Sequence, residues 1–268
     1  AAVKNNEGEW VLLNGNQTAL MFVYYLITRW KELGKINGKE YIVKTIVTTE
    51  TIKTIAERNG VEMYDVYTGF KWIANVMREN EGKKNYIGGG EESYGFLCED
   101  FVRDKDAVSA CVILAEIAAW AKDQGLSLYQ LLQKIYVEYG FSKEKGISVV
   151  KKGKSGAEEI EAMMKKFREN PLTEIAGSKV TYFYDYSTLK GKDYAENETV
   201  TLDMPTTSNV LQYFTEDNTK VSIRPSGTEP KIKFYCEVHS KVKSIDELPE
   251  AEKAAEEKIN QIKASLGI

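Results

Sequence analysis

Between residues 42 and 140 the sequence alternates between strand-like and helix-like segments, and this alternation limits the fold more than any other feature. β-branched runs such as 42–48 predict strands. Segments such as 70–79 carry apolar residues at helical spacing. Strands that alternate with helices are typical of a mostly parallel sheet. We therefore predict an α/β domain over residues 38–140.

Two longer helices complete this domain. The pattern predicts one helix from about Asp104, its expected N-cap, to Lys122. A second helix begins at Ser127, where Gln130 completes a capping box. Gly88-Gly89-Gly90 is predicted as a loop that follows a short strand and brings the backbone close to a ligand.

Residues 141–268 have a different pattern. A helix is expected to begin at Ser155, its predicted cap, and a charged helix to span 248–266. Between them lie five strand-like segments: 179–185, 199–203, 209–214, 220–224 and 231–238. The polar segment 187–198 is predicted as a hairpin loop. Clustered strands with flanking helices indicate an α+β domain with an antiparallel sheet.

Composition excludes several classes of protein. Lys and Arg number 36 against 40 Asp and Glu, a net charge of -4 that gives no reason to expect a nucleic-acid partner. No apolar run is long enough for a transmembrane helix, and residues 1–7 lack the pattern of a signal peptide. The three isolated cysteines argue against disulfides or a zinc site and favour the cytoplasm: Cys98, Cys111 and Cys236.

The segment 224–233 is the strongest candidate for a binding site. Arg224 can supply a planar fork of donors to a phosphate, and Lys233 a second positive charge. Ser226 and Thr228 add hydroxyl groups, and Gly227 permits close approach of the backbone. The alternative is an ordinary solvated hairpin turn, because Pro, Ser and Gly are common turn residues.

Two other polar residues and two cations are weaker candidates. Glu91 and Ser93 point to one face if extended and could bond to sugar hydroxyls, although an acidic surface loop has the same composition. Lys71 lies between two aromatic residues and Arg103 just before a predicted helix, and each could contact an anion. The alternatives are a lysine that packs over an aromatic ring and a local ion pair.

Two further features of the sequence are not counted as candidate sites. Residues 148–155 end like a nucleotide-binding P-loop, but Ser148 stands where the first glycine is required. His239 is the only histidine, and its place near a strand end favours a structural role.

Taken together, the segments 68–72, 89–95, 101–106 and 224–233 resemble the α-D-phosphohexomutase superfamily, in its phosphoglucomutase/phosphomannomutase branch. The resemblance implies that Glu91 and Ser93 bind hexose hydroxyls, with Lys71 and Arg103 as further cations. It also implies a set of residues that hold a phosphate: Arg224, Ser226, Gly227 and Thr228, assisted by Lys231 and Lys233.

The family moves phosphate between C1 and C6 of a hexose through a phosphoserine and a bisphosphorylated sugar. The phosphoserine loop and the magnesium loop that the resemblance leads us to expect do not occur in this sequence. We therefore expect a C-terminal portion: residues 1–37 as a remnant of domain 2, 38–140 as domain 3 and 141–268 as domain 4. Such a chain would bind hexose phosphates but have no mutase activity, because it lacks the catalytic serine and the metal loop. Mg²⁺ and glucose 1,6-bisphosphate would belong to the full-length enzyme.

The remnant would begin with a strand at 9–13 and an apolar helix that ends near Gly34, with too few neighbours for a core. We expect the helix face to be exposed and to promote self-association: Leu20, Val23, Leu26 and Trp30. Two alternatives remain open. The chain could be a native, non-catalytic sugar-phosphate-binding module, or part of a relative such as a phosphopentomutase or aminosugar mutase. The preference for glucose or mannose also stays open.

Overall fold

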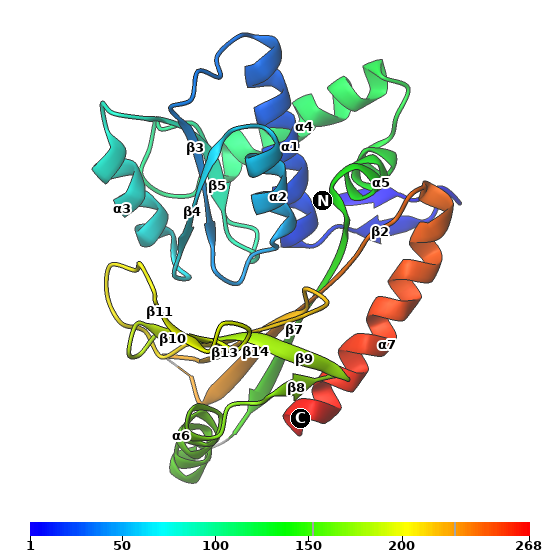
Figure 1. Cartoon of the computed structure of the whole chain (residues 1–268). Coiled ribbons are helices and arrows are strands. Elements are labelled where there is room, and N and C mark those ends of the chain that lie inside the picture. Colours follow the sequence, from blue (N-terminus) through cyan, green and yellow to red (C-terminus); the bar gives the residue numbers. More distant parts are fainter. Residues whose placement is uncertain (152, 228) are drawn as a thin grey trace. The chain divides into compact units, whose positions relative to one another are not determined.

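The computed structural model of the chain describes residues 1–151, 153–227 and 229–268. These residues form two compact units. Unit 1 comprises Ala1–Phe141 and Lys241–Leu248, and unit 2 comprises Ser142–Ser240 and Pro249–Ile268. The mixed α/β class predicted from the sequence is confirmed, and each unit has its own sheet and helices (Figure 1).

Unit 1 is built on a four-stranded sheet. The strand order is β4-β3-β5-β6, in which β3 runs parallel to β4 and β5 while β6 is antiparallel to β5. The strands span Glu40–Thr45 (β3), Glu62–Val66 (β4), Asn85–Gly90 (β5) and Phe96–Cys98 (β6). A separate antiparallel hairpin precedes the sheet, with strands Ala2–Lys4 (β1) and Trp10–Leu12 (β2).

Helices cover both faces of this sheet (Figure 1). Phe70 and Ile73 of α3 pack against Tyr41 and Val43 of β3 in a buried cluster. The opposite face is covered by α1, where Phe22 stacks on Phe96 with ring centroids 4.5 Å apart. The helices of unit 1 span Gly15–Glu32 (α1), Thr51–Arg58 (α2), Phe70–Asn80 (α3), Ala107–Asp123 (α4) and Leu128–Tyr139 (α5).

The apolar face of α1 is not exposed, so that prediction is wrong. Leu20, Val23 and Leu26 retain only 1%, 2% and 6% of their exposure. Helix α1 therefore packs within unit 1, which also removes the basis for self-association through this helix. The exposed apolar side chains of unit 1 include two on α4, Val108 at 74% and Val112 at 61%.

The three consecutive glycines form part of β5, not the predicted loop. A Cβ on Gly89 would lie 2.3 Å from the carbonyl oxygen of Val43, and one on Gly90 would lie 2.5 Å from the Phe96 ring. Strands and rings thus approach this backbone too closely for any side chain. These glycines serve packing within unit 1, and none of them lines the described pocket of this unit.

Of three predicted helix N-caps, one is confirmed and two are wrong. The Ser127 capping box is confirmed, because the Ser127 hydroxyl accepts a hydrogen bond from the Gln130 N–H at 3.1 Å. Asp104 does not cap α4. Asp106 does so, and its carboxylate accepts from the N–H groups of Val108 and Ser109. Ser155 likewise lies inside α6, which begins at Gly153.

Unit 2 contains an eight-stranded sheet with the order β11-β10-β9-β12-β13-β14-β7, and β8 pairs with β9 beside this path. The five predicted strands are present, but β7, β8 and β10 were missed, and β10 lies inside the predicted hairpin loop. The strands span Phe141–Val150 (β7), Glu174–Ile175 (β8), Ser178–Asp185 (β9), Lys190–Asp193 (β10), Glu198–Thr201 (β11), Leu211–Thr215 (β12), Lys220–Pro225 (β13) and Lys231–Ser240 (β14).

Two long helices, α6 (Gly153–Glu169) and α7 (Leu248–Leu266), cover the sheet of unit 2. A short 3-10 turn, η1 (Ile245–Glu247), precedes α7. Phe167 of α6 packs edge-on against Phe234 of β14, with ring centroids 6.3 Å apart. Among the described residues, no helix is both long and apolar enough to cross a membrane.

Candidate functional site

The candidate phosphate loop joins two antiparallel strands of unit 2. Arg224 at the end of β13 lies directly opposite Lys233 of β14. The loop is closed by the Ser226 N–H, which donates to the Lys231 carbonyl at 2.8 Å. The Ser226 hydroxyl also accepts from the Glu229 N–H at 3.3 Å. Buried residues such as Ile223 anchor the flanking strands, and these strands hold the turn in place.

Two like charges on one face define the electrostatics of this hairpin. Residues directly opposite each other in an antiparallel pair share a face, and like charges placed this way destabilise a sheet. Among the described residues, no carboxylate forms an ion pair with Arg224 or Lys233. Lys231 does pair with Glu229, and this hydrogen bond and charge lower the pKa of the Glu229 carboxyl. The arrangement favours an anion near Arg224.

A pocket of about 520 Å³ opens beside this loop. It brings together three of the predicted phosphate residues, Arg224, Ser226 and Gly227, with Lys231. Helix α6 forms part of the wall, through residues that include Glu161 and Met164. Lys233 is not among the described lining residues, and Thr228 lies outside the described residues.

The start of α6 is tied to the same loop. The Lys151 N–H donates to the carbonyl oxygen of Pro230 at 2.9 Å. The Lys151 ammonium in turn forms an ion pair with Glu159 at 2.9 Å. These two contacts hold the loop against the segment that leads into α6.

The predicted sugar residues lie in the tight connection between β5 and β6 in unit 1. The Glu91 N–H donates to the Gly95 carbonyl at 2.8 Å, which closes the turn. The Glu91 side chain is buried, and its Oε1 accepts from the Gly69 N–H at 2.7 Å. Ser93 is exposed at the tip. Glu91 therefore holds the start of α3, next to Lys71, whereas Ser93 projects toward solvent.

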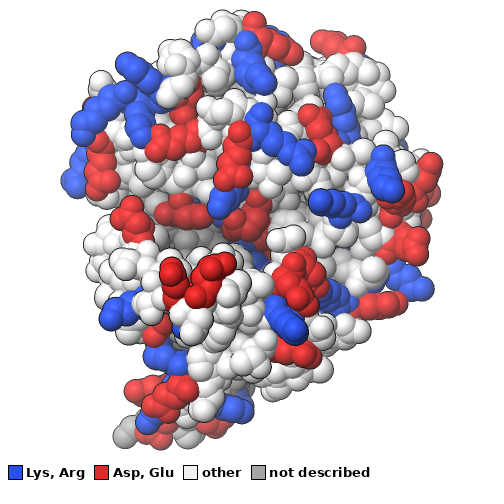
Figure 2. Space-filling model, viewed as in Figure 1, with Lys and Arg blue, Asp and Glu red and all other residues white. Residues whose placement is uncertain are grey.

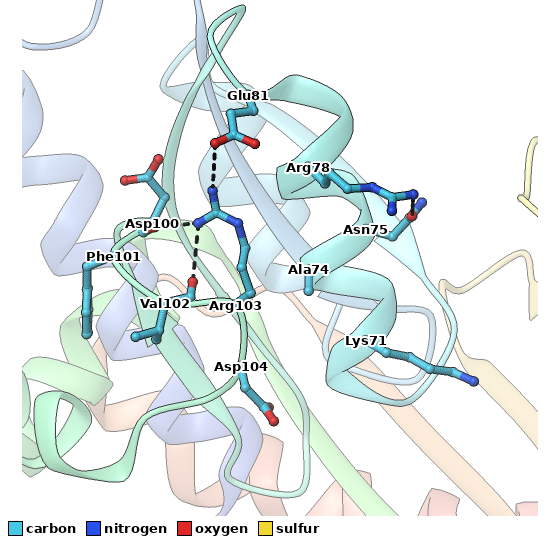
Figure 3. A pocket seen from close by; sticks show the side chains of 10 residues that line it. All are labelled: Lys71, Ala74, Asn75, Arg78, Glu81, Asp100, Phe101, Val102, Arg103 and Asp104. Atoms are coloured by element: carbon cyan, nitrogen blue, oxygen red, sulfur yellow. Dashed lines mark hydrogen bonds and ion pairs between the residues drawn. The ribbon is translucent and has the colours of Figure 1, made fainter.

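Lys71 and Arg103 come together in a second pocket, of about 750 Å³ (Figure 3). The Arg103 guanidinium donates to the Asp100 carbonyl at 2.5 Å and to Glu81 at 3.4 Å. The Lys71 ammonium lies 5.0 Å from the Trp72 ring centroid, as expected of a lysine packed over an aromatic. Glu91 and Ser93 do not line this pocket.

The charges in this second pocket balance. The lining includes three cations, Lys71, Arg78 and Arg103, and three carboxylates, Glu81, Asp100 and Asp104. Sequence reasoning missed Glu81 and Arg78, because Glu81 is 22 residues from the arginine that it contacts and no motif links them. Mixed charge also characterises the wider surface, where acidic and basic side chains are interspersed (Figure 2).

The only histidine takes part in a buried charge cluster of unit 2. His239 Nε2 lies 2.7 Å from the Glu237 carboxylate, and Lys220 Nζ lies 2.8 Å from its other oxygen. Burial acts to lower the pKa of His239, but the Glu237 carboxylate outweighs it and the pKa is raised. Within the described chain, no three His, Cys, Asp or Glu side chains gather in a metal-binding arrangement. The residues present therefore do not fit a magnesium site.

Comparison with known proteins identifies the family to which both units belong. Residues 14–139 match the family model described as phosphoglucomutase/phosphomannomutase, alpha/beta/alpha domain III, and residues 148–255 match that of the C-terminal domain of the same family. The first match includes α1, whereas the sequence prediction began this domain at residue 38.

Phosphoglucomutases are among the similar sequences. One from Staphylococcus haemolyticus is 33% identical over 236 residues, which cover 88% of this chain and 42% of the relative. One from Staphylococcus aureus is 37% identical over 234 residues, covering 87% and 41%. The chain thus spans about two fifths of the length of these relatives.

Solved structures show the same fold at low identity. The parafusin (phosphoglucomutase) from Paramecium, in an open form, has a TM-score of 0.57 at 16% identity and covers 91% of this chain and 39% of its own. A putative phosphomannomutase from Thermus thermophilus has a TM-score of 0.56 at 18% identity and covers 95% and 43%. Since the family models match both units, the chain belongs to the phosphoglucomutase/phosphomannomutase family and corresponds to its domain III and C-terminal domain.

Proposed function

We propose that this chain binds hexose phosphates and supplies the sugar- and phosphate-binding part of a phosphohexomutase. The full-length enzyme would interconvert hexose 1-phosphate and hexose 6-phosphate through a phosphoserine and a bisphosphorylated sugar. Mg²⁺ and glucose 1,6-bisphosphate would act in that enzyme, and a cytoplasmic location fits three cysteines that are all free thiols.

The observation that carries the proposal is the juxtaposition of Arg224 and Lys233 across β13 and β14. Two cations on one face lower the stability of a hairpin unless an anion lies between or beside them. Arg224 shares its pocket with the Ser226 hydroxyl and the Gly227 backbone. Charge-assisted donors and an accessible backbone are what a phosphate dianion requires. Ser226, Gly227 and Lys231 would hold the phosphate with Arg224, as would Thr228 outside the described residues.

In unit 1, we propose that the Ser93 hydroxyl and the Glu91 carboxylate contact sugar hydroxyls, with Lys71 and Arg103 nearby. Glu91 already accepts the Gly69 N–H with one oxygen, which leaves its second oxygen, Oε2, to accept from a hydroxyl. The same carboxylate would thus position α3 and bind the ligand.

The test is a calorimetric titration of the chain with glucose 6-phosphate, inorganic phosphate and glucose. We expect binding of both phosphates and weaker binding of glucose, because the phosphate loop supplies the charged donors. A coupled assay with glucose 1-phosphate should show no turnover. Binding of none of the three compounds would overturn the proposal, and turnover would overturn the expectation that catalysis needs further residues.

One alternative is a native sugar-phosphate-binding module of this length. An immunoblot of source cells with serum against this chain separates the two. A band well above 30.3 kDa indicates the larger enzyme, and a band at 30.3 kDa favours the module. A fragment of a phosphopentomutase would instead bind pentose phosphates more tightly than hexose phosphates in the same titrations.

A further inference from the structure

Asn209 lies outside the phosphate loop but lines the same pocket as Arg224 and Ser226. It belongs to the segment that leads into β12, where Leu211 lies opposite Ile223 of β13. Because the two strands are antiparallel, residues just before Leu211 run beside residues just after Ile223. The fold therefore places Asn209 next to the entrance of the phosphate loop.

The orientation of the Asn209 amide is fixed by a half-buried ion pair. Arg168 Nη2, near the end of α6, donates to Asn209 Oδ1 at 2.9 Å. Arg168 Nε donates to the carboxylate of Asp185, also at 2.9 Å, and Asp185 is only 6% exposed. The other oxygen of Asp185 accepts from the N–H and the hydroxyl of Ser187 at 3.0 and 2.7 Å. Asp185 and Ser187 thus hold the guanidinium, which in turn holds the amide oxygen.

These three residues, Asp185, Ser187 and Arg168, form a clamp on Asn209. The clamp determines which atoms of Asn209 remain available to a ligand. A side-chain amide carries one acceptor oxygen and one NH₂ group with two donors. With the oxygen bound to Arg168, the NH₂ group faces away from the guanidinium. Among the described residues, this NH₂ group donates to no partner. The pocket therefore contains a preorganised neutral donor beside the cationic Arg224.

We propose that the Asn209 amide donates a hydrogen bond to an oxygen of the phosphate bound at Arg224, and that Arg168 acts as its positioning residue. The inference rests on the proposed function, since it adds a ligand contact to the same pocket. A neutral donor complements Arg224 because it binds an oxygen without adding to the repulsion between Arg224 and Lys233. Residues 208 and 209 are separated in sequence from the loop by two strands, so the loop motif alone does not identify them.

The decisive variant is Asn209→Asp. It keeps an oxygen for Arg168, so the clamp and the fold are retained, but it replaces the two donors with negative charge. We expect the affinity for inorganic phosphate and for glucose 6-phosphate, measured by calorimetry at pH 7.5, to fall at least tenfold. The thermal midpoint should not fall, because Arg168 then bonds to a carboxylate. Asn260→Asp adds the same charge on α7, outside the pocket, and should bind phosphate like the unsubstituted chain.

A second pair of variants tests the role of Arg168. Asn209→Ala removes the donors without adding charge and should weaken phosphate binding several-fold. Arg168→Gln should weaken it in the original chain but not further in the Asn209→Ala background, because Arg168 acts through Asn209. A purely structural role for Arg168 predicts an equal loss in both backgrounds and would contradict the proposal.

The outcomes also separate this inference from the proposed function. If Arg224→Ala abolishes binding while Asn209→Asp binds normally, the contact from Asn209 is wrong and the proposed function stands. If Asn209→Asp weakens binding of glucose 6-phosphate but not of inorganic phosphate, the amide contacts the sugar and the inference is overturned. If the unsubstituted chain binds neither ligand, the proposed function itself fails.

Discussion

The two candidate ligand loops differ in how far their charged groups are already engaged by the protein. In unit 1, Glu91 accepts the Gly69 N–H, and Arg103 donates to the Asp100 carbonyl and to Glu81. In unit 2, Arg224 and Lys233 lie opposite each other, and neither pairs with a carboxylate of the described chain. An anion that binds at Arg103 in unit 1 must compete with the bonds to Asp100 and Glu81, whereas an anion that binds in unit 2 meets two cations without a carboxylate partner.

This difference indicates a division of labour. A group that gives up an internal hydrogen bond to bind a ligand gains little net free energy, whereas an unpaired charged donor gains about 1.5–3 kcal/mol. We therefore expect unit 2 to supply most of the phosphate affinity. Unit 1 would contribute orientation of the sugar through contacts that cost little to rearrange.

The largest expected effect tests the structural role of the glycines in unit 1. Gly89→Ala would place a Cβ 2.3 Å from the Val43 carbonyl oxygen, and neither strand can move freely. We expect a loss of about 3 kcal/mol or more in the free energy of unfolding, measured by urea denaturation followed by circular dichroism. No described atom lies within 4 Å of a Cβ on Gly146 or Gly227, so Gly146→Ala and Gly227→Ala should leave the transition unchanged. An unchanged transition for Gly89→Ala would contradict the packing that we describe.

The next largest effect is expected for Arg224, a proposed phosphate ligand of unit 2. Arg224→Ala should reduce the affinity for inorganic phosphate and glucose 6-phosphate by about 10- to 100-fold in calorimetry, the loss expected for a charge-assisted hydrogen bond. The thermal midpoint should not fall, since the variant relieves the repulsion with Lys233. Lys190→Ala removes an exposed cation of β10, which does not line the pocket, and serves as the matched control. Equal losses in both variants would show that only net charge matters.

A third prediction concerns the charge cluster of unit 2, in which the charged groups are paired with one another. Groups packed against His239 include the carboxylates of Glu237 and Glu144 and the ammonium of Lys220, and the carboxylates outweigh burial to raise its pKa. A raised folded pKa stabilises the fold below the unfolded value of about 6.5 and ceases to do so as the pH rises through the folded value. Each unit of elevation corresponds to about 1.4 kcal/mol.

Thermal midpoints of the chain should therefore fall between pH 6.5 and the folded pKa of His239, and His239→Gln should flatten this dependence. Because His239 is the only histidine, its imidazole gives a single NMR titration. A pKa for that signal at or below 6.5 would show that the carboxylates do not outweigh burial.

The smallest effect is expected in the second pocket. Lys71→Ala removes an exposed ammonium that packs over Trp72 in a pocket with equal numbers of cations and carboxylates. We expect the affinity for glucose 6-phosphate to change by less than about threefold, since an exposed charge contributes at most about 1 kcal/mol. A loss as large as that of Arg224→Ala would contradict the division of labour between the units.

The sequence predicted elements well where local pattern and burial agree. The helix that begins at Ser127 and the strand at 220–224 were correctly predicted because capping residues and alternating apolar residues are local signals. Gly88-Gly89-Gly90 was wrongly predicted as a loop because its glycines are required by close contacts with other strands, including β3, which is more than 40 residues away in sequence. The burial of α1 was missed for the same reason, since its partner Phe96 is more than 70 residues away.

The candidate site shows the same limit. Arg224, Ser226 and Gly227 could be identified from one contiguous segment, and the structure brings them to one pocket. Asn209 and its clamp could not, because Arg168, Asp185 and Asn209 meet only through the pairing of β9, β12 and the end of α6. The internal hydrogen bond of Glu91 to Gly69 likewise carries no signature in spacing.

The most direct test of this account is a titration of the ¹⁵N-labelled chain with glucose 6-phosphate, followed by NMR of the amide groups. We predict that the first and largest shifts occur at the backbone amides of Ser226 and Gly227 and at the side-chain NH₂ of Asn209. Smaller shifts should follow at Ser93 and Lys71 as the sugar engages unit 1. Shifts confined to unit 1, or no shifts in the 224–233 segment at saturating ligand, would contradict the claim that unit 2 holds the phosphate.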